Sequence, residues 1–507
     1  MLTITKNMYL YLEKILNYNS RLFFFIIIFL TLIPYHAPDG ILSSNEEMYL
    51  GFAEKIEVGD SYDNSCFGFS ENQSRYITDK TIKILIGHFG FENTQRIGRL
   101  LTLIMYAIAL SYFFHLLNFN VLQIIFCLLF FCLYGQDLYG GEWLFGGFEA
   151  KTLAYPILIL ALVFLLKEKY ILSFIIMGIV THFHFLIGGW FFVIFIIFIL
   201  SKGSNIKIVF RSTLIYLLII TPLIFIIAKN YYLLIDHEIY ANLPSANWIY
   251  SVFRHPHHIV PFNSIYIFIE QWSADVLVSF VILIFSMIFY LNSRNSIIKN
   301  ISLINVIILI QLSMCLLISF FDSSYYFSKL YMFRNSSISL LLSIILLLFL
   351  FDYLLGNKKS QAYFIIFVLI FFHTTPKNTF YLYKQFRKPP ITSKNLMNYV
   401  MQNTSKDDLI LIDRKIENKL HFFERITKRP TLVNYKFIPT TEIGILEWYR
   451  RLIFKDKIFK NIPTNDEYNF SYLITSNTND FLDSTYGHPI YNEEFTIYKN
   501  LSIHKPN

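Results

Sequence analysis

Long apolar tracts separated by short polar breaks dominate the chain. About eleven of them are candidate membrane-spanning helices, although several are short for a hydrocarbon core about 30 Å thick, which takes around 20 helical residues. We therefore expect the short tracts to extend into their polar flanks. The pattern predicts a mostly α, polytopic helical membrane protein. The tracts lie at residues 22–34, 97–117, 121–134, 152–166, 170–181, 185–200, 208–228, 276–292, 300–321, 336–355 and 361–373.

The stretch from Tyr170 to Leu200 is too long for one span. A single helix of this length would run about 45 Å at 1.5 Å per residue, which exceeds the hydrocarbon core. The sequence THFHF at 181–185 lies at its middle, and basic residues stand at both ends. We therefore predict a helical hairpin with both ends in the cytoplasm.

Lys and Arg beside the tracts predict sidedness, because cytoplasmic loops of membrane proteins collect positive charge. The N-terminus and residues 167–169, 201–211, 293–299 and 356–360 are then inside, and the loops 35–96, 135–151, 229–275 and 322–335 are outside. The first outside loop agrees, since its acidic residues outnumber its basic ones. Four basic residues that follow the last tract disagree: Lys377, Lys384, Arg387 and Lys388.

The composition changes near residue 390. The sequence TTEIGILEWYRRLI (440–453) is typical of a helix capped by Thr440 or Thr441. We predict a polytopic transmembrane domain over residues 1–375 and a soluble periplasmic α/β domain over residues 390–507. Four segments of the second domain have the pattern of strands: 408–413, 431–437, 471–476 and 493–500.

Composition supports the membrane prediction and narrows the class of partner. The chain is 55% hydrophobic and 15% charged, whereas soluble domains carry roughly 25% charged residues. The net charge of +8 follows from the collection of basic residues on the cytoplasmic side, so we expect no nucleic-acid partner. The four cysteines form no close C-x-x-C pair, and no disulfide framework or zinc ribbon is predicted.

Ionisable residues gather in the predicted outside loops and at membrane depth. Such groups are costly near a bilayer and usually face a protein cavity or a partner. A carboxylate there could take a proton from an acceptor hydroxyl, while a cation neutralises charge on a departing lipid phosphate. The acidic candidates are Glu46 and Glu47, and the candidates for substrate binding are Glu149, Lys151, His182, His184, Arg254, His255, His257, His258 and Arg334.

The acidic residues and Lys151 also have structural interpretations. Glu46 and Glu47 could stabilise a helix N-terminus, where acids are favoured. Glu149 and Lys151 could form an interfacial ion pair that seats the end of a helix.

The histidines have structural interpretations as well. His182 and His184 could form hydrogen bonds that satisfy the turn of the hairpin. The sequence RHPHH (254–258) could contact lipid head groups or bind zinc, although its spacing, broken by Pro256, matches no strong metal signature.

Several of these stretches carry a family resemblance. An acidic first outside loop, many spans and an exterior C-terminal domain resemble the glycosyltransferase C superfamily of integral-membrane enzymes. The sequences GGFEAKTLAYPIL, GIVTHFHFLIGGW, FRHPHHIVP and ERITKRPTLVNYKFIPTTEIGILEWYRRL resemble an uncharacterised family of bacterial multi-pass proteins near that superfamily. The resemblance implies a protein of the bacterial inner membrane that takes a sugar from a polyprenyl-phosphate donor and transfers it, with inversion, to a glycan or lipid acceptor.

The resemblance also implies a catalytic role for a carboxylate of the first outside loop, as base or metal ligand. In this chain the role falls to Glu46 or Glu47, with Asp39 in reserve. No Asp-x-Asp pair is present in that loop, so a divalent metal ion remains an open cofactor. Two other functions remain open: a surface-polysaccharide (O-antigen) polymerase that uses a diphosphate carrier, and a transporter or lipid-binding protein without catalysis.

Overall fold

The structure is a computed structural model that describes residues 20–54, 65–68, 75–231, 239–355, 391–464, 468–476 and 480–500. The chain divides into two compact units. Unit 1 comprises Met1–Asp39, Arg96–Tyr231 and Tyr250–Lys384. Unit 2 comprises Gly40–Gln95, Tyr232–Ile249 and Gln385–Asn507. The described chain is mostly helical, with a small sheet near the C-terminus.

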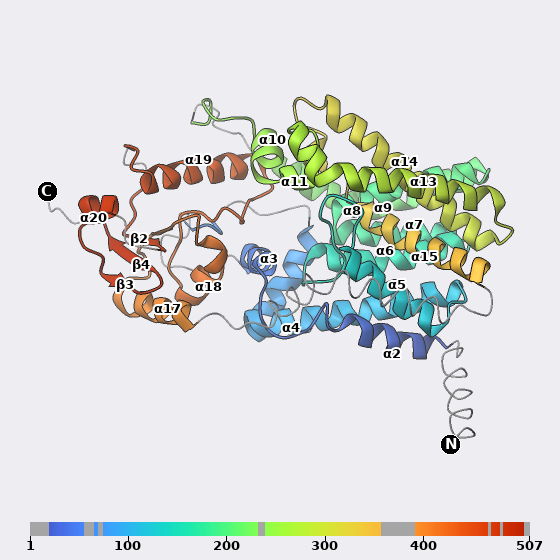
Figure 1. Cartoon of the computed structure of the whole chain (residues 1–507), viewed down its shortest axis with the longest axis horizontal. Helices are drawn as coiled ribbons and strands as arrows, with labels where there is room; N and C mark the ends of the chain where they lie inside the picture. Colours follow the sequence, from blue (N-terminus) through green and yellow to red (C-terminus); the bar gives the residue numbers. More distant parts are fainter. Residues whose placement is uncertain are drawn as a thin grey trace, which may run out of the picture. The chain divides into compact units, whose positions relative to one another are not determined.

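Unit 1 is a body of apolar helices (Figure 1). Five helices of the described chain are long and apolar enough to cross a membrane: α4 (Tyr76–Leu116), which begins in unit 2, α9 (Ile206–Tyr231), α13 with the short turns before it (Ile265–Asn292), α14 (Ser296–Phe321) and α15 (Ser336–Leu355). Five shorter apolar helices are α2 (Arg21–Leu32), α5 (Val121–Tyr134), α6 (Ala150–Leu166), α7 (Tyr170–Phe183) and α8 (Phe185–Ser201).

Each of the first ten predicted tracts coincides with one of these helices. The tract at 361–373 and the basic residues Lys377, Lys384, Arg387 and Lys388 lie outside the described residues. The number of spans therefore stays a prediction. The predicted hairpin is present as two helices, α7 and α8, which pack against each other and are separated by His184 in an extended conformation (φ −151°, ψ 102°).

Capping residues explain where some of these helices begin. Asn120 and Gln123 form a capping box at the start of α5, in which each side chain accepts a hydrogen bond from the other residue's backbone N–H. At the start of α14, the side chain of Asn295 accepts from the backbone N–H groups of Ile297 and Ile298. These bonds satisfy donors that the first turn of a helix leaves without a partner.

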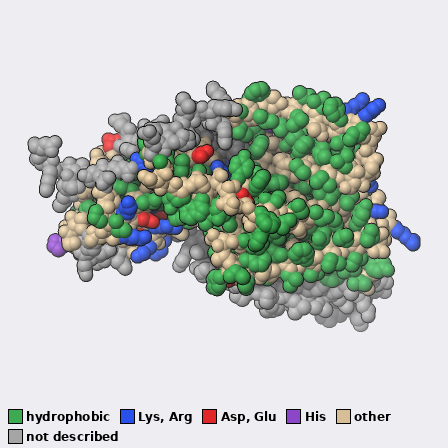
Figure 2. Space-filling view, turned by 90° about the horizontal axis from the view of Figure 1, so that it is seen from above, with side chains coloured by type: hydrophobic (Ala, Val, Ile, Leu, Met, Phe, Trp, Pro, Cys, Tyr) green, Lys and Arg blue, Asp and Glu red, His purple; other side chains and the backbone are tan. Residues whose placement is uncertain are grey.

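The apolar surface of unit 1 is continuous over much of one face (Figure 2). α9 and α13 contribute many exposed apolar side chains, among them Phe210, Phe225, Leu277 and Ile284. An exposed patch of this extent on a soluble monomer would be unusual. Facing lipid accounts for it, because hydrocarbon tails impose no penalty on such side chains.

A buried polar network joins three helices of the apolar body. The side-chain amide of Asn305 in α14 donates to Ser286 in α13 and to Ser343 in α15, both at 3.0 Å. Ser339 of α15 donates to the Asn305 carbonyl at 2.8 Å. Every polar group of Asn305 is thus used between helices, which is how polar side chains stabilise helix packing within membranes.

Unit 2 contains a four-stranded sheet and several helices (Figure 1). The strands β1 (Ile410–Ile412), β2 (Tyr472–Thr475), β3 (Tyr491–Asn492) and β4 (Thr496–Lys499) lie in the order β1-β2-β4-β3, with β1 parallel to β2 and the other pairs antiparallel. The main helices are α3 (Ser44–Glu54), the start of α4, α17 (Ile391–Asn403), α18 (Phe423–Thr427), α19 (Glu442–Phe459) and α20 (Asp480–Tyr486). Leu396 and Val400 of α17 belong to the same buried hydrophobic cluster as Ile410 and Ile412 of β1.

Most of the predicted elements of this sheet region are present. The segments 408–413, 471–476 and 493–500 contain β1, β2 and β4, and Thr441 caps α19 by accepting from the Gly444 N–H. The strand predicted at 431–437 is wrong, since only Thr431 forms a bridge, to Ile410. The reason is that two buried carboxylates take backbone N–H groups that a strand would use for pairing: Glu424 accepts from Thr431, and Glu417 accepts from Tyr435.

Candidate functional site

A buried ion cluster in unit 1 joins residues from three distant parts of the chain. Glu142, in the loop between α5 and α6, lies 3.3 Å from Nζ of Lys151 and 3.3 Å from Nη2 of Arg334. Nη1 of Arg334 lies 3.0 Å from Nε2 of His184. We call these four residues the Glu142 cluster. Because arginine can only donate, Nε2 of His184 is the acceptor of this hydrogen bond.

Aromatic rings support both cations of the cluster. The Lys151 ammonium lies 3.8 Å from the centre of the Trp143 ring, and the Arg334 guanidinium lies 4.7 Å from the Tyr331 ring centre. Such contacts stabilise a cation by about 0.5–2 kcal/mol, most where water is excluded. Tyr331 holds a left-handed backbone conformation (φ 48°), which is uncommon for a non-glycine residue and typical of functional or tightly constrained sites.

The loop that carries Glu142 has an unusual backbone. Gly135, Gly140, Gly141 and Gly146 have positive φ angles, as does Gln136 (φ 74°). The Gln136 side chain fixes the loop by accepting from the N–H groups of residues 144 and 145 and donating to the carbonyl of residue 145. Glycine tolerates these angles without steric cost, so the paired glycines of the sequence are what allow the loop to adopt this path.

The RHPHH segment contacts the same loop. Nδ1 of His258 donates to the carbonyl of Gly140, and a Cβ atom on Gly141 would lie only 2.8 Å from the His258 ring. The His255 and His257 rings lie 6.1 and 4.0 Å from the His258 ring. Burial, together with the charge of neighbouring His257, lowers the pKa of His258 to about 4. His258 is therefore neutral near pH 7 and keeps Nε2 as an acceptor.

The two carboxylates of the loop differ in their surroundings. Burial raises the pKa of Glu142, but the charges of Arg334 and Lys151 outweigh it and hold that pKa below its usual value. Asp137 accepts a hydrogen bond at 2.9 Å from the backbone N–H of Glu142. Burial is the main reason that the pKa of Asp137 is raised to about 7, and the Glu142 charge adds to it. One acid is thus ionised and the other is poised near neutral pH.

The acids expected in the first outside loop are held by other contacts. Nε of Arg425 lies 2.6 Å from Glu47 Oε1, within unit 2. Glu46 accepts from the Ser43 N–H, while Ser43 accepts from the Glu46 N–H, so the two form a capping pair at the start of α3. These contacts favour the structural interpretation of both glutamates. Asp39 belongs to unit 1, and its Oδ1 lies 3.4 Å from Nη1 of Arg99.

The remaining predicted residues have varied surroundings. Glu149 is buried at the N-cap of α6, where its N–H donates to Thr152 Oγ1. His182 contacts the carbonyl of Ile219 in α9 through Nε2 at 2.8 Å, so its hydrogen bond goes to another helix and not to the turn of the hairpin. His255 donates from Nδ1 to the Tyr250 carbonyl at 3.0 Å. Arg254 is half-buried at the end of a short π-helix, η3 (Ile249–Arg254).

The structure therefore brings together Lys151, His184 and Arg334 around Glu142, with His258 against the same loop. Glu142 and Asp137 were not among the sequence-derived site residues. Their signal in the sequence is the acidic, glycine-paired stretch GQDLYGGEW. Only the positions of Lys151 and Arg334 in space single out Glu142 within that stretch.

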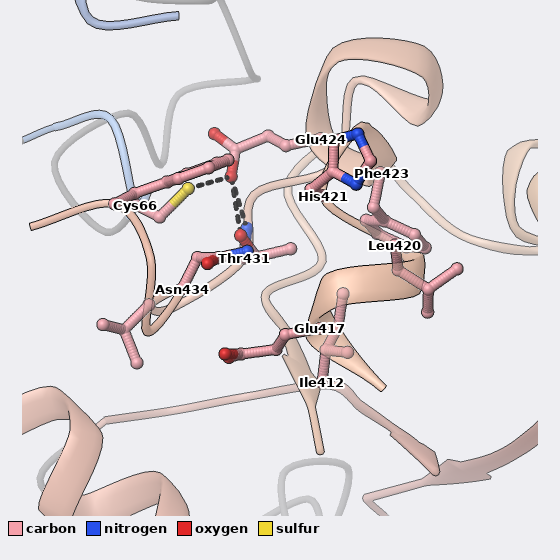
Figure 3. A pocket seen from close by; sticks show the side chains of 11 residues that line it. Cys66, Ile412, Glu417, Leu420, His421, Phe423, Glu424, Thr431 and Asn434 are labelled. Atoms are coloured by element: carbon pink, nitrogen blue, oxygen red, sulfur yellow. Dashed lines mark hydrogen bonds between the residues drawn. The ribbon is translucent and has the colours of Figure 1, made fainter. Parts of the chain in front are cut away.

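Unit 2 has a small pocket lined by residues of the α18 region (Figure 3). The Glu424 carboxylate at this pocket accepts from the Ser65 hydroxyl, the Cys66 thiol, and both the N–H and hydroxyl of Thr431. Glu417 is paired with Lys455. Both carboxylates are thus committed to internal contacts, and burial raises the pKa of the Cys66 thiol well above its usual value, which disfavours the reactive thiolate. The polar residues of this pocket therefore serve to hold unit 2 together.

The described residues do not fit a resident metal ion. No group of three or more His, Cys, Asp or Glu side chains in the described part of the chain is arranged to hold one. The rings of His257 and His258 are adjacent. Nδ1 of His258 is already used in a hydrogen bond to the Gly140 carbonyl. We therefore assign no step to a metal ion.

The comparisons with known proteins bear on unit 2. Residues 392–453 match a family model described as a domain of unknown function, DUF6798. The matched stretch covers nearly all of α17, then β1, α18 and most of α19. No curated protein matches the chain. The similarity therefore assigns no activity.

Proposed function

We propose that this protein is a membrane transferase that takes a sugar from a polyprenyl-phosphate donor, with the Glu142 cluster as the site that binds the donor phosphate. In this proposal the protein belongs to a bacterial inner membrane and acts at its outer face on a glycan or lipid acceptor. The apolar helices of unit 1 would receive the polyprenyl chain.

The charge balance of the cluster carries the proposal. Two cations, Lys151 and Arg334, flank one ionised carboxylate, and all three side chains are at most 10% exposed. A surplus positive charge away from water is costly unless an anion compensates it. A phosphate supplies that anion, and the planar guanidinium suits its geometry.

The neighbouring side chains fit the same ligand. His258 keeps an acceptor nitrogen next to the glycine-paired loop, and the loop backbone can approach a ligand closely at its glycines. Trp143 and Tyr331 are aromatic rings at the cluster, and such rings commonly line small-molecule sites. These features support a phosphate-bearing sugar donor over a bare inorganic anion.

Binding and transfer by purified protein in lipid nanodiscs test the proposal. We expect saturable binding of a polyprenyl-phosphate sugar from a donor panel, and transfer of labelled sugar to an acceptor. Arg334→Gln and Lys151→Gln should each weaken donor binding by about tenfold or more, the loss expected for a charged hydrogen bond. Arg294→Gln and Lys299→Gln are the matched controls, because both residues are exposed cations of the same unit.

Two outcomes would contradict the proposal. One is the absence of binding and transfer with every polyprenyl-phosphate donor. The other is a donor affinity that the cluster variants leave unchanged relative to the controls. Transfer of oligosaccharide from diphosphate carriers alone would instead indicate a polysaccharide polymerase, and flux across proteoliposomes without transfer would indicate a transporter.

A further inference from the structure

We infer that Asp137, in the loop between α5 and α6, is the proton acceptor of the transfer reaction. The inference rests on the proposed function and names a residue outside the first loop. It stands on three features of Asp137: its lack of an ion-pair partner, its place beside the Glu142 cluster, and the rigidity of the loop that holds it.

Asp137 is a carboxylate of the loop between α5 and α6 that no cation holds among the described residues. Glu142, in the same loop, is committed to Lys151 and Arg334. Asp137 is half-buried, and its carboxylate accepts from the N–H of Glu142 through Oδ2. No ion pair to Asp137 is present among the described residues. A general base needs a lone pair that can reach the substrate, and this carboxylate retains one.

The position of Asp137 suits the reaction. Its hydrogen bond to the Glu142 backbone fixes it next to the residue that both cations hold. A donor phosphate bound at those cations would therefore present its sugar close to Asp137. Gln136, directly before it, ties the loop to residues 144 and 145, so the carboxylate is held by a rigid backbone, which favours a defined attack geometry.

The step balances in atoms and electrons. The acceptor hydroxyl oxygen forms a bond to the anomeric carbon of the donor sugar while the bond from that carbon to the phosphate oxygen breaks. The bonding electrons leave with the phosphate, and polyprenyl phosphate is released. The hydroxyl proton passes to the Asp137 carboxylate and then to solvent.

The electrostatics of Asp137 agree with this role. Glu142 in its own loop and Asp275 in α13 are the carboxylates that face it, and both act with burial to raise its pKa to about 7. Two cations, Lys151 and Arg334, pair with Glu142 beside Asp137. The neutral His258 bonds to the Gly140 carbonyl of the same loop. A base whose pKa lies near the working pH combines sufficient ionised form with good proton affinity.

Asp137→Asn is the decisive variant, because asparagine keeps the acceptor oxygen for the Glu142 N–H and the loop should still form. We expect kcat to fall by about 10²- to 10⁴-fold, the usual contribution of a general base, with donor affinity unchanged. The wild-type kcat/KM should decline as the pH falls below about 7, and this acidic limb should be absent from the residual activity of the variant. Asp137→Glu should restore part of the rate.

Asp352→Asn is the matched control, since Asp352 is another half-buried carboxylate of unit 1 and accepts its hydrogen bond from Gln123 of α5. We expect it to transfer sugar at nearly the wild-type rate. Asp137→Asn with wild-type kcat overturns the inference and leaves the proposed function intact. A wild-type protein that binds and transfers nothing overturns both. Loss of donor binding together with kcat in Asp137→Asn would show a structural role and would also contradict the inference.

Discussion

The guanidinium of Arg425 holds both carboxylate oxygens of Glu47, with Nε 2.6 Å from Oε1 and 3.0 Å from Oε2. The two residues are 378 positions apart in the chain and come from α18 and α3 of unit 2. An acid of the loop predicted to lie outside is thereby part of the packing of unit 2. We therefore expect removal of the Glu47–Arg425 pair to lower the stability of unit 2.

Arg425→Ala should destabilise unit 2 by about 3 kcal/mol, because it leaves the buried Glu47 carboxylate without its cation. Thermal unfolding of the solubilised protein, followed through a probe in unit 2, measures the loss. Arg414→Ala is the control, since Arg414 forms an exposed pair with Asp456, and such pairs contribute about 0–1 kcal/mol. Equal stability of the two variants would contradict a structural role for the Glu47 pair.

Gly141→Ala should destabilise unit 1 by about 2 kcal/mol, because alanine is strained at φ +66° and its Cβ would meet His258. Donor binding should weaken with it, since the loop also positions Glu142. Gly189→Ala is the opposite case: the position lies inside α8 with open space around it, and alanine there should stabilise the helix by about 0.5–1 kcal/mol. Equilibrium unfolding in detergent compares the two, and an unaffected Gly141→Ala protein would rule out the close approach of His258.

Asn305→Ala should cost about 2 kcal/mol, because three interhelical hydrogen bonds are lost and each contributes about 0.6 kcal/mol within a membrane protein. Ser313→Ala serves as the control: among the described residues, the Ser313 hydroxyl bonds only to the Leu309 carbonyl of its own helix. We expect that variant to lose less than about 0.5 kcal/mol. Unfolding of both in mixed micelles decides the matter, and similar losses would mean that the Asn305 network does not join the helices.

His258 should lower the stability of unit 1 when the pH drops from about 6.5 toward 4, because the folded protein keeps this side chain neutral. Its pKa is about 4 when folded and 6.5 ordinarily, so in this window the unfolded chain binds the additional proton and is favoured. The raised pKa of Asp137 acts in the opposite direction over this window, so the His258 contribution is measured as the difference between wild type and His258→Asn. His258→Asn keeps a donor for the Gly140 carbonyl and should show a smaller loss between about pH 7.5 and pH 5. His488→Asn is the control, since His488 is exposed. If the stability of His258→Asn depended on pH as that of the wild type does, the prediction would be contradicted.

The helical body could be predicted because lipid crossing leaves a local signature. A run of apolar residues is visible in one stretch of sequence, and a polar residue within it, such as His184, marks a break. The strand predicted at 431–437 failed for a reason that is not local. Its alternating apolar residues fit a strand, but the carboxylates of Glu417 and Glu424 take its backbone donors.

The candidate site was only partly predictable for the same reason. Lys151, His184 and Arg334 stood out as charged or polar groups near apolar tracts, yet the residue that they surround did not. Arg334 lies far from Glu142 in the sequence and meets it only through the packing of the helices. The choice among acids depends on which cation each of them meets, and a single sequence does not contain that pairing.

The stretch that matches the family model is shorter than the compact unit to which it belongs, unit 2. The match ends at residue 453, inside α19, whereas the partner strand of β1 begins at Tyr472 and the donors Ser65 and Cys66 of Glu424 come from before α4. A fragment trimmed to the matched stretch would thus present a bare strand edge and a carboxylate stripped of half its donors. An excised unit 2 would have to join three segments of the chain: residues 40–95, 232–249 and 385–507.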